Sequence, residues 1–259
     1  MIGSIALITA AIHFAPRPTR PGSFGPRLNA AGSPTPVRLG AESNRTAGLG
    51  LQSAAGASNL DAITAQRQKD DESTALARRA NTLLASGDPK GAVRLLEEAL
   101  RLTPAEETFH YNLGIAYSRS GDVTNAELHY REALRLLPDY PEVHNNLGNL
   151  LLHAGRLSEA EAQFTEAIRL MPELASAHNN LGLVRRNQNR MPEAIACFRK
   201  AVQYNTNYWQ AHYNLALASL SQGATNEGRR ELQTVLRLNP GYGPAQSTLD
   251  RLPAQPSGQ

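Results

Sequence analysis

The sequence predicts an all-α fold: a right-handed α-solenoid of five stacked helix–turn–helix units that follows a disordered N-terminal region. Two marks recur at one constant interval, a leucine followed by a small residue and a proline that ends the preceding unit. The pairs are Leu113-Gly114, Leu147-Gly148, Leu181-Gly182 and Leu215-Ala216, and the prolines are Pro104, Pro138, Pro172 and, two intervals later, Pro240. Between these marks each unit carries two apolar stripes at helical spacing. Such a period is typical of helix pairs that bury their apolar faces against their neighbours in an open array.

The first fifteen residues form an apolar run without Lys, Arg, Asp or Glu. The run is shorter than the ~20 residues that a membrane-spanning helix needs. Its length suits the hydrophobic part of a signal peptide, although a positively charged start and a clear cleavage site are missing. Residues 1–15 therefore favour export or N-terminal membrane tethering over a cytoplasmic location. A misplaced start codon or an apolar tail remains the alternative, and contact with a membrane is expected only through this segment.

Residues 16–72 are expected to be a disordered linker. Prolines interrupt a stretch rich in Gly, Ala, Ser and Arg, and Phe24 is its one aromatic residue. A segment with so little apolar surface cannot offset the entropy that ordering would cost. Near residues 60–72 the composition becomes polar and compatible with a helix, so the first helix can begin early.

From residue 73 onward, each unit shows where its turn lies and where its two helices cross. Gly or Asn is expected at the turn, because the left-handed conformation that ends a helix costs these residues least. The turn positions are Gly87, Gly121, Gly155, Asn189 and Gly223. Small residues in the first helix leave room for the crossing second helix, whose larger side chains fill the space beside them. The small residues are Ala80, Gly114, Gly148, Gly182 and Ala216, and the larger ones are Leu96, Tyr130, Phe164, Phe198 and Leu232. Gly228, inside the last second helix, is expected to cost about 1 kcal/mol relative to alanine.

This pattern resembles the tetratricopeptide repeat family, in which a small residue beside leucine and a late proline recur with a period of ~34 residues. Placing Pro104 at the family's proline position gives repeats at 73–106, 107–140, 141–174, 175–208 and 209–242. The fourth repeat departs from the family, with Arg185 where an aromatic residue is usual and Thr206 where proline is usual. Residues 243–252 are expected to form a short capping helix, and residues 253–259 a disordered tail.

No catalytic constellation, cofactor site or metal site is predicted. Cys197 is the one cysteine, and its place in an amphipathic helix indicates a partly buried, inert thiol. Four histidines, His110, His144, His178 and His212, recur once per repeat at the same position. Equivalent positions in stacked repeats lie about 10 Å apart, too far for two of them to share a metal, so packing is the better interpretation. His129 and His153 are interpreted as isolated surface residues.

The composition also argues against nucleic acid and small molecules as ligands. The net charge is only +3 and is spread along the chain, without a continuous basic stripe and stacking aromatics. The short arginine clusters are interpreted as solvated helix faces. No glycine-rich phosphate loop is present, and no small-molecule substrate is predicted.

Asparagine is the residue type that points to a function. Asn112, Asn146, Asn180 and Asn214 recur at the repeat interval on the first helices, where asparagine is a mediocre helix former. They resemble the asparagine ladder in the repeat superhelix of O-linked N-acetylglucosamine transferases, although no segment here is long enough for a transferase domain. In such repeats the first helices line the concave face, and a carboxamide can grip a peptide backbone through a donor and an acceptor. Asn145, Asn149, Asn179 and Tyr213 are neighbouring groove candidates, and Arg78 stands at the ladder position of the first repeat.

The sequence therefore predicts a non-catalytic scaffold that binds an extended polypeptide in the concave groove of a solenoid. One alternative is a structural component of an envelope or secretion complex that docks through the edges of the solenoid and is tethered by its N-terminus. For the asparagines the alternative is that they cap or bridge adjacent helices.

Overall fold

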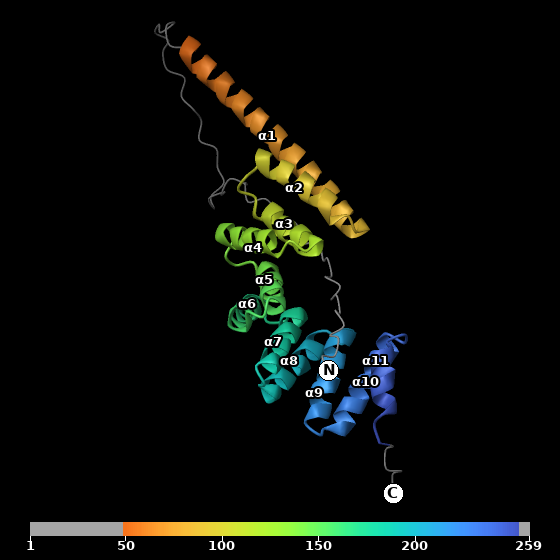
Figure 1. The fold of residues 1–259 in the computed structure, drawn as a ribbon. Helices are drawn as coiled ribbons and strands as arrows, with labels where there is room; N and C mark the ends of the chain where they lie inside the picture. Colours follow the sequence, from red (N-terminus) through yellow and green to blue (C-terminus); the bar gives the residue numbers. More distant parts are fainter. Residues whose placement is uncertain (1–48, 254–259) are drawn as a thin grey trace, which may run out of the picture. The chain divides into compact units, whose positions relative to one another are not determined.

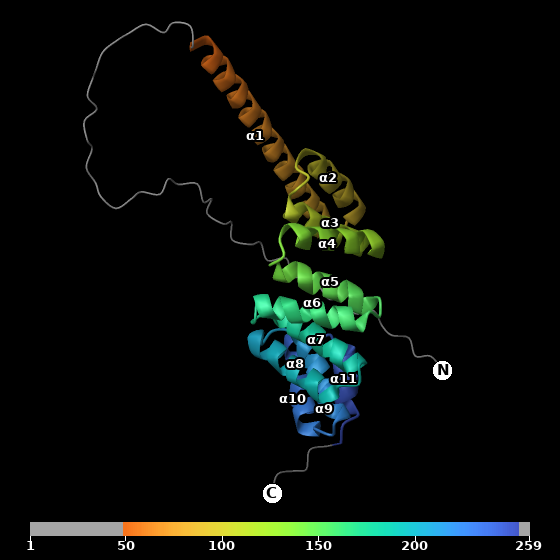
Figure 2. The same cartoon turned by 90° about the vertical axis from the view of Figure 1, so that its left-hand side faces the viewer.

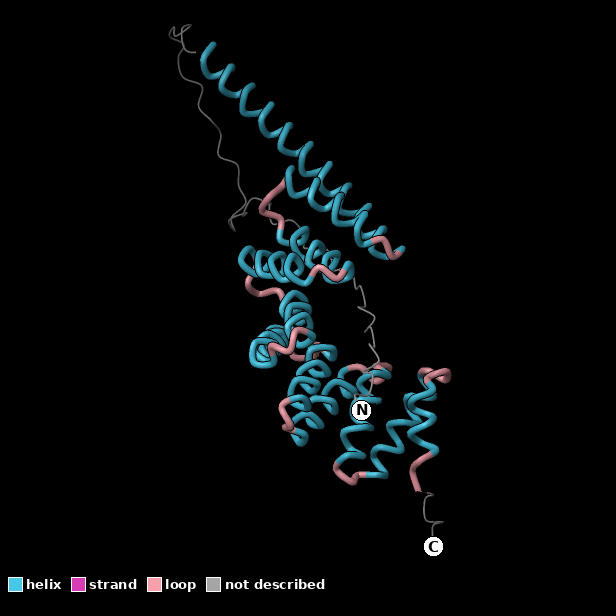
Figure 3. Tube along the Cα trace, in the orientation of Figure 1, coloured by secondary structure: helices cyan, strands magenta, loops and turns pink. Residues whose placement is uncertain are grey.

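A computed structural model describes the backbone of residues 49–253 and the side chains of residues 60–253. Within this range there are eleven helices and no strand (Figures 1 and 3). The helices are α1 (Leu49–Ser86), α2 (Pro89–Leu102), α3 (Glu107–Ser120), α4 (Val123–Leu136), α5 (Pro141–His153), α6 (Leu157–Leu170), α7 (Ala175–Asn187), α8 (Met191–Tyr204), α9 (Trp209–Ser221), α10 (Thr225–Leu238) and α11 (Gly243–Asp250). The expectations for residues 1–15, for the linker up to residue 48 and for residues 254–259 concern parts of the chain outside this description. No helix in the described range is both long and apolar enough to cross a membrane.

The helices form antiparallel pairs that stack in chain order, as in the predicted solenoid (Figure 2). Each odd-numbered helix from α1 to α9 is the first helix of a repeat, and the even-numbered helix after it is the second. The first helices of successive repeats also contact each other, α3 with α5 and α5 with α7. Because first helices approach one another across the repeats, they form the inner face of the stack.

The first helix begins earlier than the predicted linker boundary allows. The linker was expected to extend to residue 72, but α1 already begins at Leu49. Residues 60–72 are exposed along their whole length, so this part of the helix buries little surface. Long polar residues with good helix propensity, and a hydrogen bond from Gln66 to Asp70 one turn later, support it instead. A search for apolar stripes cannot detect such a helix, because it has none.

The five turns have the predicted left-handed conformation. Gly87, Gly121, Gly155 and Gly223 have φ angles of 74–85°, and Asn189 has a φ of 62°. In the first two repeats an aspartate follows the glycine and caps the second helix. The Asp88 carboxylate accepts a hydrogen bond from the Gly91 amide at 2.8 Å, and Asp122 accepts one from the Asn125 amide at 3.1 Å. The turn therefore ends one helix and begins the next within two residues.

The crossing of the two helices in each repeat matches the sizes of the facing side chains. A Cβ atom added to Gly182 would lie 2.6 Å from the ring of Phe198, and one added to Gly148 would lie 2.8 Å from Phe164. Both rings are fully buried. In the first and last repeats, where the larger residue is a leucine, the small residue is an alanine. Glycine is thus paired with an aromatic ring and alanine with leucine, as space at the crossing demands.

Gly228 corrects one expectation. A Cβ atom at this position would lie 2.5 Å from Cγ of Leu220 and 3.2 Å from the carbonyl oxygen of Ala216. Glycine here makes room for the neighbouring helix, so its intrinsic helix cost is offset by packing that alanine would disturb.

Candidate functional site

The asparagines of the first helices form one chain of hydrogen bonds that runs across four repeats. Asn214 Nδ2 donates to Asn179 Oδ1 at 2.8 Å, and Asn180 Nδ2 donates to Asn145 Oδ1 at 3.2 Å. Within each helix the neighbouring amides are linked as well, Asn179 to Asn180 at 3.2 Å and Asn145 to Asn146 at 3.5 Å. The chain ends where Asn146 Nδ2 donates to the Tyr111 hydroxyl at 3.1 Å. We call these six residues the amide chain.

The amide chain leaves hydrogen-bonding capacity unused. A carboxamide has two N–H donors and an oxygen that accepts two hydrogen bonds. Asn145, Asn146 and Asn180 each donate once and accept once in the chain, so one donor and one acceptor site of each remain. These three side chains and Asn214 are partly exposed on the first-helix face. They can therefore hold a group that needs both a donor and an acceptor, as a peptide unit does.

Not all predicted groove residues belong to this chain. Asn112 is buried, with 3% of its surface exposed, and takes no part in the chain. The hydrogen bonds between repeats join each asparagine to the residue 35 positions earlier. For Asn112 that residue is Ala77, whose side chain cannot accept a hydrogen bond. Asn149 is partly exposed without a side-chain hydrogen bond to another described residue, and Tyr213 packs edge-on against Tyr242 with ring centroids 5.0 Å apart.

Tyr111 belongs to the site and was not among the predicted residues. It occupies the same repeat position as Asn145, Asn179 and Tyr213, and this shared position is the signal that could have revealed it. Burial, and then the nearby Tyr140 and Glu142, raise the pKa of Tyr111 well above its usual value. The phenol therefore stays neutral and accepts the last hydrogen bond of the chain as a hydroxyl.

The recurring histidines are structural, as predicted. Nε2 of each one lies within hydrogen-bonding distance of the carbonyl oxygen six residues earlier, just after the preceding second helix. These distances are 3.3 Å from His110 to Pro104, 2.9 Å from His144 to Pro138, 2.8 Å from His178 to Pro172 and 3.0 Å from His212 to Thr206. Each histidine thus ties the connection between two repeats to the helix that follows it. No group of three potential metal ligands occurs among the described residues.

The other ring nitrogen of these histidines points to the second helix of the same repeat. His144 Nδ1 lies 2.8 Å from Gln163 Oε1, and His212 Nδ1 lies 2.5 Å from Glu231 Oε2. His110 Nδ1 lies 3.0 Å from Nδ1 of His129, which corrects the interpretation of His129 as an isolated surface residue. Burial, and then the nearby His110, lower the pKa of His129. His153, in contrast, is exposed.

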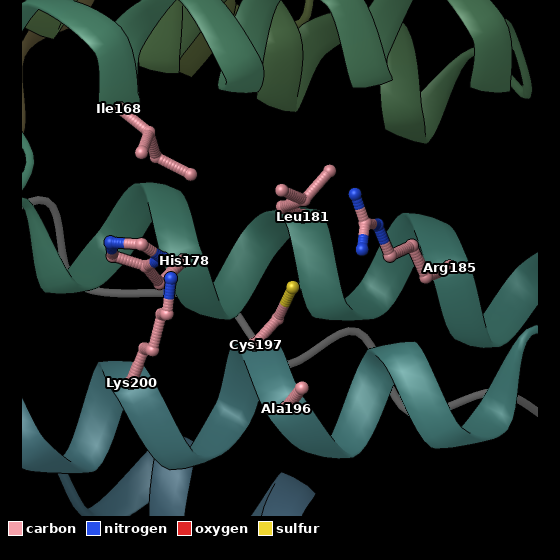
Figure 4. Close-up of a pocket in the computed structure, with 7 residues that line it drawn as sticks. All are labelled: Ile168, His178, Leu181, Arg185, Ala196, Cys197 and Lys200. Atoms are coloured by element: carbon pink, nitrogen blue, oxygen red, sulfur yellow. The ribbon is translucent and has the colours of Figure 1, made fainter.

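The fourth repeat has Cys197 at the corresponding position, and a small cavity lies there. The cavity has a volume of about 180 Å³ and is lined by Ile168, His178, Leu181, Arg185, Ala196, Cys197 and Lys200. Figure 4 shows Cys197 on α8 with its sulfur directed towards α7. The thiol is 6% exposed, and burial raises its pKa. Its surroundings thus favour the uncharged thiol, which is a poor nucleophile.

Arginine–glutamate pairs connect the repeats along the second helices. Arg156 Nη1 lies 2.7 Å from Glu127 Oε2 of the preceding repeat, and Arg190 Nη1 lies 3.0 Å from Glu161 Oε1 in the same relation. Arg185 contacts Glu193 at 3.0 Å. These arginines are therefore neutralised by carboxylates and do not add up to a basic surface.

Comparison with known proteins agrees with the repeat pattern. A tetratricopeptide repeat family profile matches residues 77–141, 111–175, 145–208 and 179–243. Among curated proteins none matches the chain significantly in sequence.

Several solved structures have the same fold. The protein pilF of Pseudomonas aeruginosa is 23% identical, with a TM-score of 0.58, over 71% of this chain and 89% of its own. MamA of Desulfovibrio magneticus RS-1 is 21% identical, with a TM-score of 0.58, over 67% of this chain and 98% of its own. YrrB, described as a TPR protein with an unusual peptide-binding site, is 19% identical with a TM-score of 0.54, over 68% of this chain and 90% of its own. Since the family profile also covers most of the chain, this protein belongs to the tetratricopeptide repeat family.

Proposed function

We propose that this protein is a non-catalytic interaction scaffold that binds an extended segment of another polypeptide along the first-helix face of its repeats. Proteins with tetratricopeptide repeats are generally protein-interaction scaffolds without enzymatic activity. One related structure, YrrB, is described as having a peptide-binding site. What supports the finer proposal for this chain is the amide chain, in which partly exposed carboxamides keep one free donor and one free acceptor each.

An extended backbone has the chemistry that these amides require. It offers an N–H donor and a C=O acceptor at each residue, and it advances about 3.3 Å per residue. Hydrogen bonds between the asparagines already hold their side chains in fixed orientations, so binding costs less side-chain entropy than it would with free rotamers. Asn146, Asn180, Asn214 and Asn145 would contact the backbone directly. Asn149 and Tyr213 would flank it.

The two buried candidates do not contact the ligand in this proposal. Asn179 is 4% exposed and Asn112 is 3% exposed, so neither reaches a ligand freely. Asn179 accepts from Asn214 and donates to Asn180, and it therefore orients two exposed amides.

The test is a comparison of what the full-length protein and a triple variant, Asn146/Asn180/Asn214→Ala, retain from a cell extract. We expect specific polypeptides that the wild type retains to be lost by the variant, while its helical content stays the same. A double variant, Gln203→Ala/Gln233→Ala, is the matched control, because it removes two exposed carboxamides from second helices.

If the triple variant and the wild type retain the same polypeptides, the amide chain only bridges adjacent helices and the proposed groove is wrong. If the control variant loses them too, loss of carboxamides in general, and not the first-helix face, explains the result.

A further inference from the structure

One arginine on the first-helix face has no partner among the described residues. Arg186 lies in the last turn of α7 and is partly buried, without an ion pair or a side-chain hydrogen bond. It follows Asn179 and Leu183 at helical spacing, i, i+4 and i+7, so it lies on the stripe of α7 that carries the amide chain. Burial lowers the pKa of its guanidinium, and no carboxylate counteracts this effect.

Arg186 differs in this respect from the other partly buried arginines of residues 60–253. Arg156, Arg185 and Arg190 all pair with glutamates, and Arg229 donates a hydrogen bond to the carbonyl oxygen of Pro253. A guanidinium carries five N–H donors and is costly to remove from water without an acceptor. The protein supplies an acceptor for at least one N–H group at each of the four other sites, although Nε of Arg185 and Nε of Arg229 are buried without a hydrogen-bond partner.

The repeat architecture does not require a cation at this position. The residues at the same position in the other repeats are Leu84, Ser118, Leu152 and Leu220. Leucine is thus the common solution, and it packs into the apolar core, Leu84 as part of one core cluster and Leu152 and Leu220 against core clusters. A helix C-terminus favours a positive charge, but this weak effect leaves the donors of the side chain unsatisfied.

Among residues 60–253 no carboxylate forms an ion pair with Arg186, and α7 itself carries neither aspartate nor glutamate. The one glutamate on helix α5, Glu142, lies in its first turn, whereas Arg186 lies in the last turn of α7. Successive first helices run in the same direction, so these two residues stand at opposite ends of the face. The charge of Arg186 is therefore available to a ligand.

We propose that Arg186 binds a carboxylate of the partner, so that the groove prefers an extended segment carrying an aspartate or glutamate. This inference rests on the proposed function and names the chemistry of the bound segment. The planar guanidinium can bind a carboxylate through two parallel, charge-assisted hydrogen bonds. The neutral asparagine amides cannot form such a charged pair. The amide chain holds the backbone, and Arg186 selects the acidic side chain.

The experiment uses a random library of 12-residue peptides displayed on phage and selected on the full-length protein. The best binder is synthesised together with a counterpart in which each Asp is replaced by Asn and each Glu by Gln. Dissociation constants of both peptides are measured by fluorescence anisotropy for the wild type, Arg186→Leu, Asn180→Ala and Arg230→Leu. Leucine is the substitute because the same position holds leucine in three other repeats, and Arg230 is an exposed arginine on a second helix.

We expect the acidic peptide to bind the wild type at least about tenfold more tightly than its amide counterpart, as a charge-assisted hydrogen bond pair implies. Arg186→Leu should abolish this difference and Arg230→Leu should preserve it. Asn180→Ala should weaken both peptides by the same factor. Circular dichroism confirms that each variant is as helical as the wild type.

Two results separate the failure of this inference from that of the proposed function. If the peptides bind in a manner that depends on Asn180, but the acidic preference is absent or survives Arg186→Leu, the role of Arg186 is wrong and the groove stands. If no selected peptide depends on Asn180, the proposed groove fails, and this inference fails with it.

Discussion

Glycine is paired with an aromatic ring at the helix crossings. We therefore predict that one substitution, Gly182→Ala, lowers the free energy of unfolding in the wild type but raises it when the aromatic ring is replaced. Alanine in place of Gly182 would put a Cβ atom 2.6 Å from the Phe198 ring, which is fully buried. Ordinary carbon contacts lie at about 3.5–4.0 Å, so the ring must shift by roughly 1 Å in a packed interior. Overpacking of this kind typically costs about 1–3 kcal/mol, while alanine gains about 1 kcal/mol over glycine from helix propensity.

The two effects can be separated with Phe198→Leu. In the wild-type background we expect Gly182→Ala to lower the free energy of unfolding by up to about 2 kcal/mol. In the Phe198→Leu background the alanine faces leucine, as Ala80 faces Leu96 in the first repeat, and only the helix propensity remains. There Gly182→Ala should raise the free energy of unfolding by up to about 1 kcal/mol.

Urea unfolding followed by circular dichroism gives the four free energies of this double-mutant cycle. The coupling between the two substitutions should be about 1–3 kcal/mol, since it measures the overpacking alone. If Gly182→Ala has the same effect in both backgrounds, the glycine does not serve the aromatic ring and the size-matching account is wrong. Gly87→Ala, at a left-handed turn with open space around it, is a control that should destabilise equally in both backgrounds.

Three further predictions concern the turns, the amide chain and the histidines. Asn189→Ala should lower the free energy of unfolding by about 1–2 kcal/mol because of its left-handed backbone, and Asn189→Gly should not; urea unfolding checks both, and equal losses would contradict the backbone explanation. Asn179→Ala removes two hydrogen bonds of a buried side chain and should cost about 1–3 kcal/mol, whereas Asn149→Ala on the same face should stay within about 0.5 kcal/mol. Urea unfolding measures both losses, and equal losses for Asn179→Ala and Asn149→Ala would mean that the amide chain adds no stability. The lowered pKa of His129 means that the unfolded chain takes up this proton at a higher pH than the folded protein does, so the free energy of unfolding should fall as the pH drops from about 7 to about 5, through the usual histidine pKa near 6.5. His129→Gln, which copies Gln163 of the next repeat, should make this decline shallower, and an unchanged slope in unfolding experiments across this range would refute the assignment.

The sequence alone determined the features of this protein that depend on a single repeat or on nearest neighbours. The left-handed turn at Asn189 and the Gly182–Phe198 crossing follow from steric rules that act within one helix pair, and the repeat period shows each of them several times. The structural role of the recurring histidines was predicted for the same reason. The early start of α1 was missed in part, because residues 60–72 form an exposed helix without an apolar stripe.

Only the tertiary structure decided how side chains of different repeats meet. The hydrogen bonds of the amide chain join residues 35 positions apart, one more than the repeat length, so the regular spacing of the asparagines does not reveal them. Burial separated Asn112 from the exposed amides, although its spacing is the same. Arg186 could be recognised as unpaired only once the carboxylates around its neighbours were located. These distinctions depend on rotamers and on packing between repeats, and a periodic sequence is equally compatible with several such arrangements.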